Sequence, residues 1–305
     1  MNGAKKALMV AFALLILSCY ACEGGSPPSP DTGTTTTTAA GGSSDPSKVL
    51  IGSFNLQVFG VTKAGKPEVM AVLAQIIRHF DLIAVQEIRG AGGTSVIDLK
   101  NAVYSTGVSY DYEIGPRLGR TSSKEQYAFF YNTATIVASS GAYTFDEGGI
   151  DTFEREPFIA HFKAKNGDFT FTLVDIHTKP EDATAEITFL PNVLSEARPH
   201  TAEADVICLG DFNADGSYFN ETSYSSIFPS STFDWLISNS QDTTQASSSN
   251  TYDRIVTYLA SDEDFDGTAG VYRYDQVLSM GSTTPDQVSD HYPVYAEFWV
   301  GKDTD

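Results

Sequence analysis

Four apolar, strand-like runs in the sequence end in polar residues that a buried strand does not need for packing, and a fifth polar group directly precedes the last strand. The four termini are Asn55, Gln86-Glu87, His177 and Asp211-Phe212-Asn213, and the fifth group is Ser289-Asp290-His291. One polar terminus is usually a cap or a turn, but five on separate strands are harder to explain in that way. Because loops at strand ends present side chains from a rigid base, we expect these residues to meet in one site.

The residue types at these termini suit one kind of chemistry. Five side chains offer oxygen ligands of the kind that Mg²⁺ or Mn²⁺ prefers: Glu87, Asp211, Asp290, Asn55 and Asn213. His177 and His291 can each act as an acid or a base near neutral pH. The sequence has no Cys-His cluster with zinc spacing, no serine elbow and no phosphate-binding glycine loop. Together these features indicate metal-assisted hydrolysis of a phosphate ester, with one base for water and one acid for the leaving oxygen.

The elements that must position these residues are short strands and a few helices. Apolar runs predict strands over 49–54, 81–85, 127–131, 135–145, 158–162, 169–176, 206–209, 255–259 and 294–300. Helical spacing predicts helices over 68–80 and 183–197. No repeat or second linker divides this region, so the pattern predicts one layered α/β domain with one or two sheets.

Composition limits the classes of protein that fit. The chain has 305 residues, 41% of them hydrophobic, which is enough for a sizeable core. Its 19 basic and 39 acidic residues give a net charge of −20, which argues against tight, passive nucleic-acid binding. Collagen, coiled coil and wholesale disorder are excluded. Three cysteines are too few for a disulfide-rich scaffold, and we expect Cys208, in an apolar run, to be buried.

Residues 1–22 have the pattern of an export signal peptide. Two lysines precede an apolar run over 7–17 that is too short to cross a bilayer. Two interpretations stay open: a lipoprotein signal, in which Cys19 carries lipid and attaches the protein to a membrane, or an ordinary secretory signal. Residues 23–47, rich in Gly, Ser, Thr and Pro, predict a flexible tether. We therefore expect an exported protein, either secreted or lipid-anchored at the cell envelope.

Seven short motifs follow one another between residues 50 and 300. They are Ser53-Phe54-Asn55, Val85-Gln86-Glu87-Ile88-Arg89, Lys124-Glu125-Gln126-Tyr127, Arg155-Glu156-Pro157, Gly210-Asp211-Phe212-Asn213-Ala214-Asp215, Tyr252-Asp253-Arg254-Ile255-Val256 and Ser289-Asp290-His291-Tyr292-Pro293-Val294. In these motifs, and in the block 233–237, the sequence resembles the endonuclease/exonuclease/phosphatase superfamily and its deoxyribonuclease I-like branch. The resemblance implies an α/β fold of four layers, two packed β-sheets flanked by helices, forming a nuclease domain over 48–305.

The resemblance also implies metal and DNA contacts. For a Mg²⁺ or Mn²⁺ ion it implies Glu87 as the principal ligand, with Asp211, Asp290 and Asn55 around the metal or the phosphate. The residues implied to contact DNA are Arg89, Arg155 and Tyr252.

For catalysis, the resemblance implies six residues: His177, His291, Glu125, Asp253, Asp211 and Asn213. Asp253 would orient His291 as the base on water, and Glu125 would orient His177 as the acid on the departing 3′ oxygen. In each pair the carboxylate fixes the tautomer of the imidazole and raises its basicity. The acid and base assignments can be exchanged, and the sequence does not decide between them.

Several positions depart from the family's pattern. Gly216 and Asn250 stand where the animal enzyme has two cysteines in a disulfide, and Ser123 stands where a tyrosine packs on DNA. The segment Asp262-Glu263-Asp264-Phe265-Asp266-Gly267 has the oxygen spacing of the first half of a calcium loop. The glutamate that would complete the loop is Arg273, so structural Ca²⁺ and a solvated acidic loop are both open.

We expect an exported, divalent-metal-dependent endonuclease, acting as a monomer, that cuts DNA to leave 5′-phosphate and 3′-hydroxyl ends. The alternative is a phosphodiesterase or phosphatase of the same superfamily that acts on phospholipid head groups or small phosphates, since the superfamily includes such enzymes. Arg155, Tyr252 and the block 233–237 favour DNA, whereas the missing aromatic ring at Ser123 argues against it. A non-catalytic binding protein on the same fold would have lost metal ligands or histidines, and none is lost.

Overall fold

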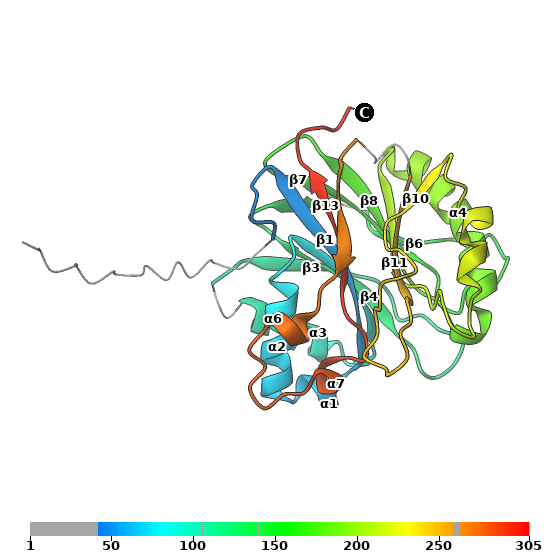
Figure 1. Ribbon diagram of the computed structural model, residues 1–305. Helices are drawn as coiled ribbons and strands as arrows, with labels where there is room; N and C mark the ends of the chain where they lie inside the picture. The colour runs from blue at the N-terminus through cyan, green and yellow to red at the C-terminus, as the bar shows by residue number, and fades with distance from the viewer. Residues whose placement is uncertain (1–41, 105–106, 140, 259–262, 305) are drawn as a thin grey trace, which may run out of the picture. The chain divides into compact units, whose positions relative to one another are not determined.

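Two β-sheets form the framework of the protein (Figure 1). The computed structural model describes residues 42–104, 107–139, 141–258 and 263–304. The predicted signal peptide, Cys19 and most of the predicted tether lie outside the described residues, as does Asp262. None of the described helices combines the length and the apolar content needed to cross a membrane.

Within the described residues, one sheet has six strands in the order β12-β13-β1-β2-β4-β3, and the other has seven, in the order β10-β11-β9-β8-β7-β5 with β6 paired to β7. The strands are β1 (Lys48–Phe59), β2 (Leu82–Ile88), β3 (Tyr110–Ile114), β4 (Gln126–Asn132), β5 (Ile136–Ala138), β6 (Tyr143–Thr144), β7 (Phe158–Ala164), β8 (Thr170–His177), β9 (Val206–Asp211), β10 (Phe233–Trp235), β11 (Asp253–Tyr258), β12 (Phe265–Val271) and β13 (Val294–Trp299). The helices are α1 (Val61–Ala64), α2 (Pro67–Ile77), α3 (Thr94–Tyr104), α4 (Ala183–Thr201), α5 (Tyr224–Ile227), α6 (Tyr274–Val277) and α7 (Pro285–Val288), with short 3₁₀ turns at Pro180–Asp182 and Glu221–Ser223.

Alternating side chains build the layers. In β2, Leu82 and Ala84 point into a core between the two sheets, while Ile83 and Val85 point into a second core beneath α2 and α3. Both faces of the strand are therefore buried, which explains why its sequence is a continuous apolar run. A third core lies between the seven-stranded sheet and α4, and Figure 1 shows α4 beside that sheet. The predicted four-layer α/β fold is confirmed.

Aromatic rings fill the space between the sheets. Phe129 of β4 lies 5.5 Å, centroid to centroid, from both Phe158 and Phe162 of β7. All three side chains are essentially excluded from solvent. Because buried aromatic rings remove large apolar areas from water, they hold the two sheets at a fixed separation and so fix the site at their ends.

Most predicted elements are present, with shifted ends. The single strand predicted over 135–145 is two short strands, β5 and β6, and Gly141 between them has a φ of 106° that an extended strand does not accommodate. The predictions missed β3, β10, β12 and α3. The solvated loop considered for 262–267 is wrong where the chain is described, because Phe265 starts β12, Asp264 is buried and Asp266 pairs with Lys48 at 2.6 Å.

Candidate active site

The site forms where β1, β2, β8 and β9 end. β1 and β2 run parallel, as do β8 and β9, so their carboxyl ends lie at one edge of each sheet. The pairing of β1 with β2 shifts register after Asn55, and the pairing of β2 with β4 shifts between Val85 and Ile88. Glu87, within the second shift, has a φ of 61°. These irregularities redirect side chains out of the sheet pattern and toward the site.

His177 and Glu125 form the first hydrogen-bonded pair. His177 Nδ1 lies 2.8 Å from Glu125 Oε2, and both side chains are buried. Burial alone would raise the pKa of Glu125, but the hydrogen bond from His177 and the charges of His177, Arg155 and Arg89 lower it to about 2. Glu125 is therefore an anion near neutral pH and fixes the orientation of the His177 ring.

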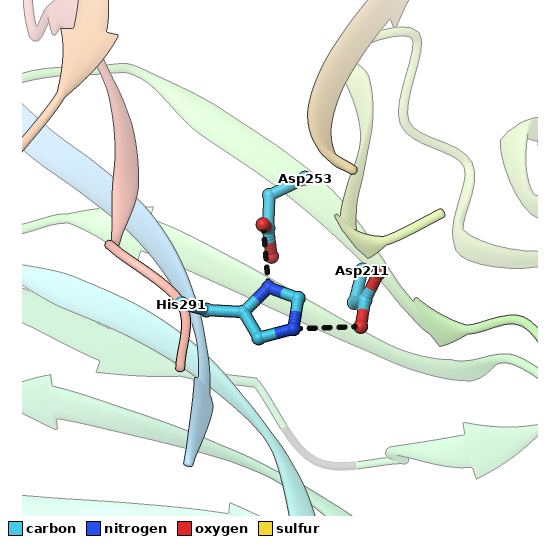
Figure 2. A group of neighbouring side chains, drawn as sticks. All are labelled: Asp211, Asp253 and His291. Atoms are coloured by element: carbon cyan, nitrogen blue, oxygen red, sulfur yellow. Dashed lines mark hydrogen bonds and ion pairs between the residues drawn. The ribbon is translucent and has the colours of Figure 1, made fainter. Parts of the chain in front are cut away.

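His291 and Asp253 form the second pair (Figure 2). His291 Nδ1 lies 2.8 Å from Asp253 Oδ2. Burial alone would lower the pKa of His291, but the carboxylates of Asp253 and Asp211 outweigh it and raise the pKa above its ordinary value. An isolated β-bridge between His291 and Thr244 fixes the backbone of this histidine against the loop before β11.

Asp211 lies between the two pairs. Its Oδ2 is 3.6 Å from His177 Nε2 and 3.6 Å from His291 Nε2, and it accepts a hydrogen bond of 2.9 Å from Asn55 Nδ2. Sheet register places it there, because Asp211 is the direct partner of His177 in β8 and of Asp253 in β11. Burial raises the pKa of Asp211, but the two histidines and Asn55 outweigh it and lower the pKa.

The oxygen donors for a cation lie around this point. Asn55 Nδ2 also donates to Glu87 Oε1 at 3.2 Å, so one amide bridges the carboxylates of Glu87 and Asp211. Asp290 is exposed, and its Oδ1 lies 3.8 Å from His291 Nε2. Ligand atoms of Asp211, Asp253 and His291 also lie within 4.8 Å of one another. This concentration of hard oxygen donors suits a divalent cation.

The Asn55 side chain faces the carboxylates through its nitrogen, while its Oδ1 accepts from the Gln57 amide at 2.8 Å. In this arrangement Asn55 supports the carboxylates of Glu87 and Asp211, and coordination of a metal by any of the three stays a prediction. Asn213 has a φ of 48°, its amide N–H donates to Asp211 Oδ1, and its Nδ2 donates to the Thr178 carbonyl. It therefore holds Asp211 in place at the end of β9.

The residues predicted to contact DNA have different surroundings. The Arg89 side chain is 32% exposed, and its Nη2 lies 3.0 Å from Glu87 and 2.8 Å from Glu125. Arg155 is buried and donates from Nε and Nη2 to the His177 carbonyl, at 3.2 and 2.8 Å. Tyr252 is half-buried, with its ring 6.3 Å from that of His291. Arg155 therefore holds the backbone of His177 in place, and phosphate contacts of these residues stay predictions.

Two buried carboxyl groups close to the site were not predicted. Asp175 is fully buried two residues before His177, accepts from Gln86 Nε2 at 2.7 Å, and has a pKa raised well above its ordinary value by burial. Glu186, in the first turn of α4, accepts from the amides of Glu154 and Lys179. An acid inside the apolar run 173–176 was a signal for the first, but nothing in the local pattern marked the second.

Comparisons with known proteins agree with this geometry. Residues 52–291 match the sequence model of the Endonuclease/Exonuclease/phosphatase family. The chain belongs to that family. It is 34% identical to deoxyribonuclease-1 of Bos taurus over 254 residues, and the aligned region covers 80% of this chain and 90% of the relative. It is 35% identical to the Homo sapiens enzyme with the same coverage, and 33% identical to deoxyribonuclease gamma of Mus musculus over 79% of this chain and 82% of the relative.

Solved structures extend the likeness at the level of the fold. An endonuclease/exonuclease/phosphatase from Bacteroides vulgatus matches with a TM-score of 0.59 at 15% identity, covering 83% of this chain and 99% of that chain. A mannosyl-6-phosphatase of Bacteroides thetaiotaomicron matches with a TM-score of 0.55 at 18% identity, covering 82% and 98%. The predicted superfamily and its deoxyribonuclease I-like branch are confirmed. With the family comes the enzyme class, a hydrolase that acts on phosphodiester bonds.

Proposed function

We propose that the protein is an exported, divalent-metal-dependent endonuclease that hydrolyses DNA phosphodiester bonds and leaves 5′-phosphate and 3′-hydroxyl ends. The observation that carries this proposal is the placement of two histidines, each hydrogen-bonded to its own carboxylate. The Nε2 atoms of His177 and His291 both lie 3.6 Å from one oxygen of Asp211. Hydrolysis of a phosphodiester needs a base on one side of phosphorus and an acid on the other, and this arrangement offers both.

The chain's own residues would act as follows. One imidazole accepts the proton of the attacking water at Nε2, while the other donates its Nε2 proton to the departing 3′ oxygen. Glu125 and Asp253 hold the Nδ1–H of each ring, so the catalytic nitrogen of both rings faces the substrate. This orientation removes the need to reorganise either ring during the reaction.

Glu87, Asp211 and Asp290 would hold the divalent cation, with Asn55 supporting them. The cation supplies neutralisation of phosphate charge when bound. The cation would also favour substrate binding, because the chain carries a net charge of −20 and is repelled by DNA. Arg89, Arg155 and Tyr252 are the proposed DNA contacts of this chain.

Export is part of the proposal. In the proposal, residues 1–22 are the signal peptide, and the chain is either lipidated at Cys19 or cleaved near it. Residues 23–47 are the tether that leads to the nuclease domain at 48–305. The relatives named deoxyribonuclease-1 support DNA as the substrate. The proposed molecule acts as a monomer.

Supercoiled plasmid tests the proposal. The full chain is incubated with plasmid in Mg²⁺ or in EDTA, alongside His177→Ala, His291→Ala and a matched control, His200→Ala, whose side chain is exposed on α4. We expect nicking in Mg²⁺ only, lost in the first two variants and kept in the third. DNA ligase alone should then reseal the nicks, since it requires 5′-phosphate and 3′-hydroxyl ends.

Other outcomes would redirect the assignment. Plasmid left intact by a folded, Mn²⁺-binding protein would favour the phosphodiesterase or phosphatase alternative, with phospholipid head groups and small phosphate esters as the next substrates. Nicking in EDTA, or nicking unaffected by both histidine variants, would contradict the proposed site. Nicks that ligase cannot reseal would contradict the proposed chemistry of the ends.

A further inference from the structure

Lys63 lies close to the active site but outside every motif described above. It belongs to α1, and its Nζ donates to three backbone carbonyls: Leu56 at 2.8 Å, Gln57 at 2.6 Å and Val288 at 2.9 Å. An ammonium group has three N–H donors, so these contacts satisfy it completely. The three carbonyls come from two segments of the chain more than 200 residues apart, the end of β1 and the end of α7.

The first segment holds a strained conformation. Gln57 and Val58 have φ values of 46° and 53°, and for the β-branched Val58 this is an unfavourable region. The Val58 side chain is 52% exposed, so apolar burial does not compensate for the strain. Something else must hold the backbone in this conformation.

The strained backbone orients Glu87 and Asn55. The Val58 amide donates to Glu87 Oε2 at 2.7 Å, and the Gln57 amide donates to Asn55 Oδ1 at 2.8 Å. The carbonyls of Leu56 and Gln57 accept instead from the Lys63 ammonium. One face of the turn therefore fixes Glu87, and Lys63 fixes the turn.

The second segment leads directly to the catalytic histidine. Val288 ends α7, and the next residue, Ser289, donates from Oγ to the Asn55 carbonyl at 2.6 Å. The Ser289 hydroxyl also accepts from the His291 amide at 3.1 Å. The Lys63 contact with Val288 thus holds the start of the segment that carries Asp290 and His291.

We propose that Lys63 is a positioning residue, a clamp that joins the turn at 56–58 to the end of α7 and so fixes Glu87 relative to His291. The inference rests on the proposed function, because it treats Glu87 as a metal ligand. Groups that orient metal ligands from behind typically change metal affinity by about 10- to 100-fold when they are removed. We therefore expect Lys63→Met to weaken divalent-cation binding by about tenfold or more.

The sign of the effect separates a clamp from a simple charge effect. Lys63 is a cation close to Glu87 and Asp290, so removing its charge alone would make the site more attractive to Mn²⁺. A clamp predicts the opposite, since Glu87 loses its fixed orientation. Lys66→Met is the matched control, because Lys66 lies three residues away and is exposed.

Two measurements on the full chain without substrate test the clamp. Mn²⁺ affinity is measured by titration calorimetry, and amide hydrogen exchange is measured at Gln57, Val58 and His291. We expect Lys63→Met to bind Mn²⁺ at least about tenfold more weakly and to exchange these amides faster, while Lys66→Met matches wild type. Val58→Gly in the Lys63→Met background should recover part of the lost affinity, because glycine adopts positive φ without strain.

Equal or tighter Mn²⁺ binding by Lys63→Met, with slow exchange retained, would overturn the inference. A wild-type chain that binds no Mn²⁺ would instead overturn the proposed metal site, and the exchange rates alone would then decide the clamp. If Lys63→Met fails to fold, Lys63→Gln keeps a donor at the same position without charge, and the same two measurements are applied to it.

Discussion

Glu186 gives the most quantitative prediction of this structure. Its carboxylate is excluded from solvent at the start of α4 and accepts hydrogen bonds from two amides, Glu154 at 3.1 Å and Lys179 at 3.3 Å. The first amide directly precedes Arg155, and the second lies two residues after His177. Burial raises the pKa of Glu186 from 4.5 to about 7, although the amides, Arg155 and His177 act to lower it.

The raised pKa makes stability depend on pH in a definite direction. Below pH 4.5, Glu186 is protonated in both the folded and the unfolded chain, and it carries no penalty. Between 4.5 and about 7 the unfolded chain ionises first, so this group's contribution to stability is lost as pH rises. At about 1.4 kcal/mol per pKa unit, the loss reaches about 3 kcal/mol above pH 7.

Glu186→Gln removes the titration and keeps an acceptor for one amide. Urea unfolding of wild type and variant, followed between pH 4 and pH 8, cancels the other titrating groups when the difference in unfolding free energy is taken. We expect this difference to grow by about 3 kcal/mol in favour of the variant as pH rises. Glu196→Gln, at an exposed position of the same helix, should show a constant difference. A flat difference for Glu186→Gln, or one that grows in favour of wild type, would refute the reasoning.

Three further predictions concern the core, the site and the chain between them. Phe129→Ala opens a cavity between the sheets and should cost about 3–5 kcal/mol of unfolding free energy in a denaturant titration; a loss below 1 kcal/mol would contradict the packing. Glu125→Gln leaves His177 without its anionic partner, and single-turnover nicking should slow by about 10²–10⁴-fold with the fold intact by circular dichroism. Gly210 has a φ of 147°, and in Gly210→Ala the new Cβ would collide with the Ile176 carbonyl. We expect this variant to lose about 4 kcal/mol or more of unfolding free energy in the same denaturant titration. A variant as stable as wild type would show that β8 and β9 pair differently.

Much of the fold was predictable because its strands are buried on both faces. Short, continuous apolar runs such as 82–85 and 206–209 are typical of strands that are buried on both faces of a sheet. β12 was missed because its sequence contains two glycines and follows an acidic segment, and it is held by pairing with β13 and by the ion pair between Lys48 and Asp266. Short strands of this kind depend on tertiary partners more than on their own residues.

The sequence could predict which residues gather at the candidate site, but not how they contact one another. His177 and Asp211 end apolar runs and His291 precedes one, which marks all three in the sequence. The role of Asn55 as a bridge between Glu87 and Asp211 depends on register shifts in β1 and β2 that no local pattern encodes. The sequence predicts a DNA contact for Arg155, and the structure adds a contact that the sequence did not predict, the hydrogen bonds from Arg155 to the His177 carbonyl. Contacts between distant segments set these roles.

The central claim is that one histidine pair takes the proton of the attacking water, while the other pair protonates the departing 3′ oxygen. A DNA oligonucleotide with a single 3′-bridging sulfur tests it directly, because a thiolate leaves without a general acid. Release of the thiol is followed for wild type, His177→Ala and His291→Ala, and cleavage is followed on the all-oxygen strand. We predict that one variant is slow on oxygen and recovers on sulfur, whereas the other is slow on both. Recovery of both variants, or of neither, would contradict the assignment of one acid and one base to this site.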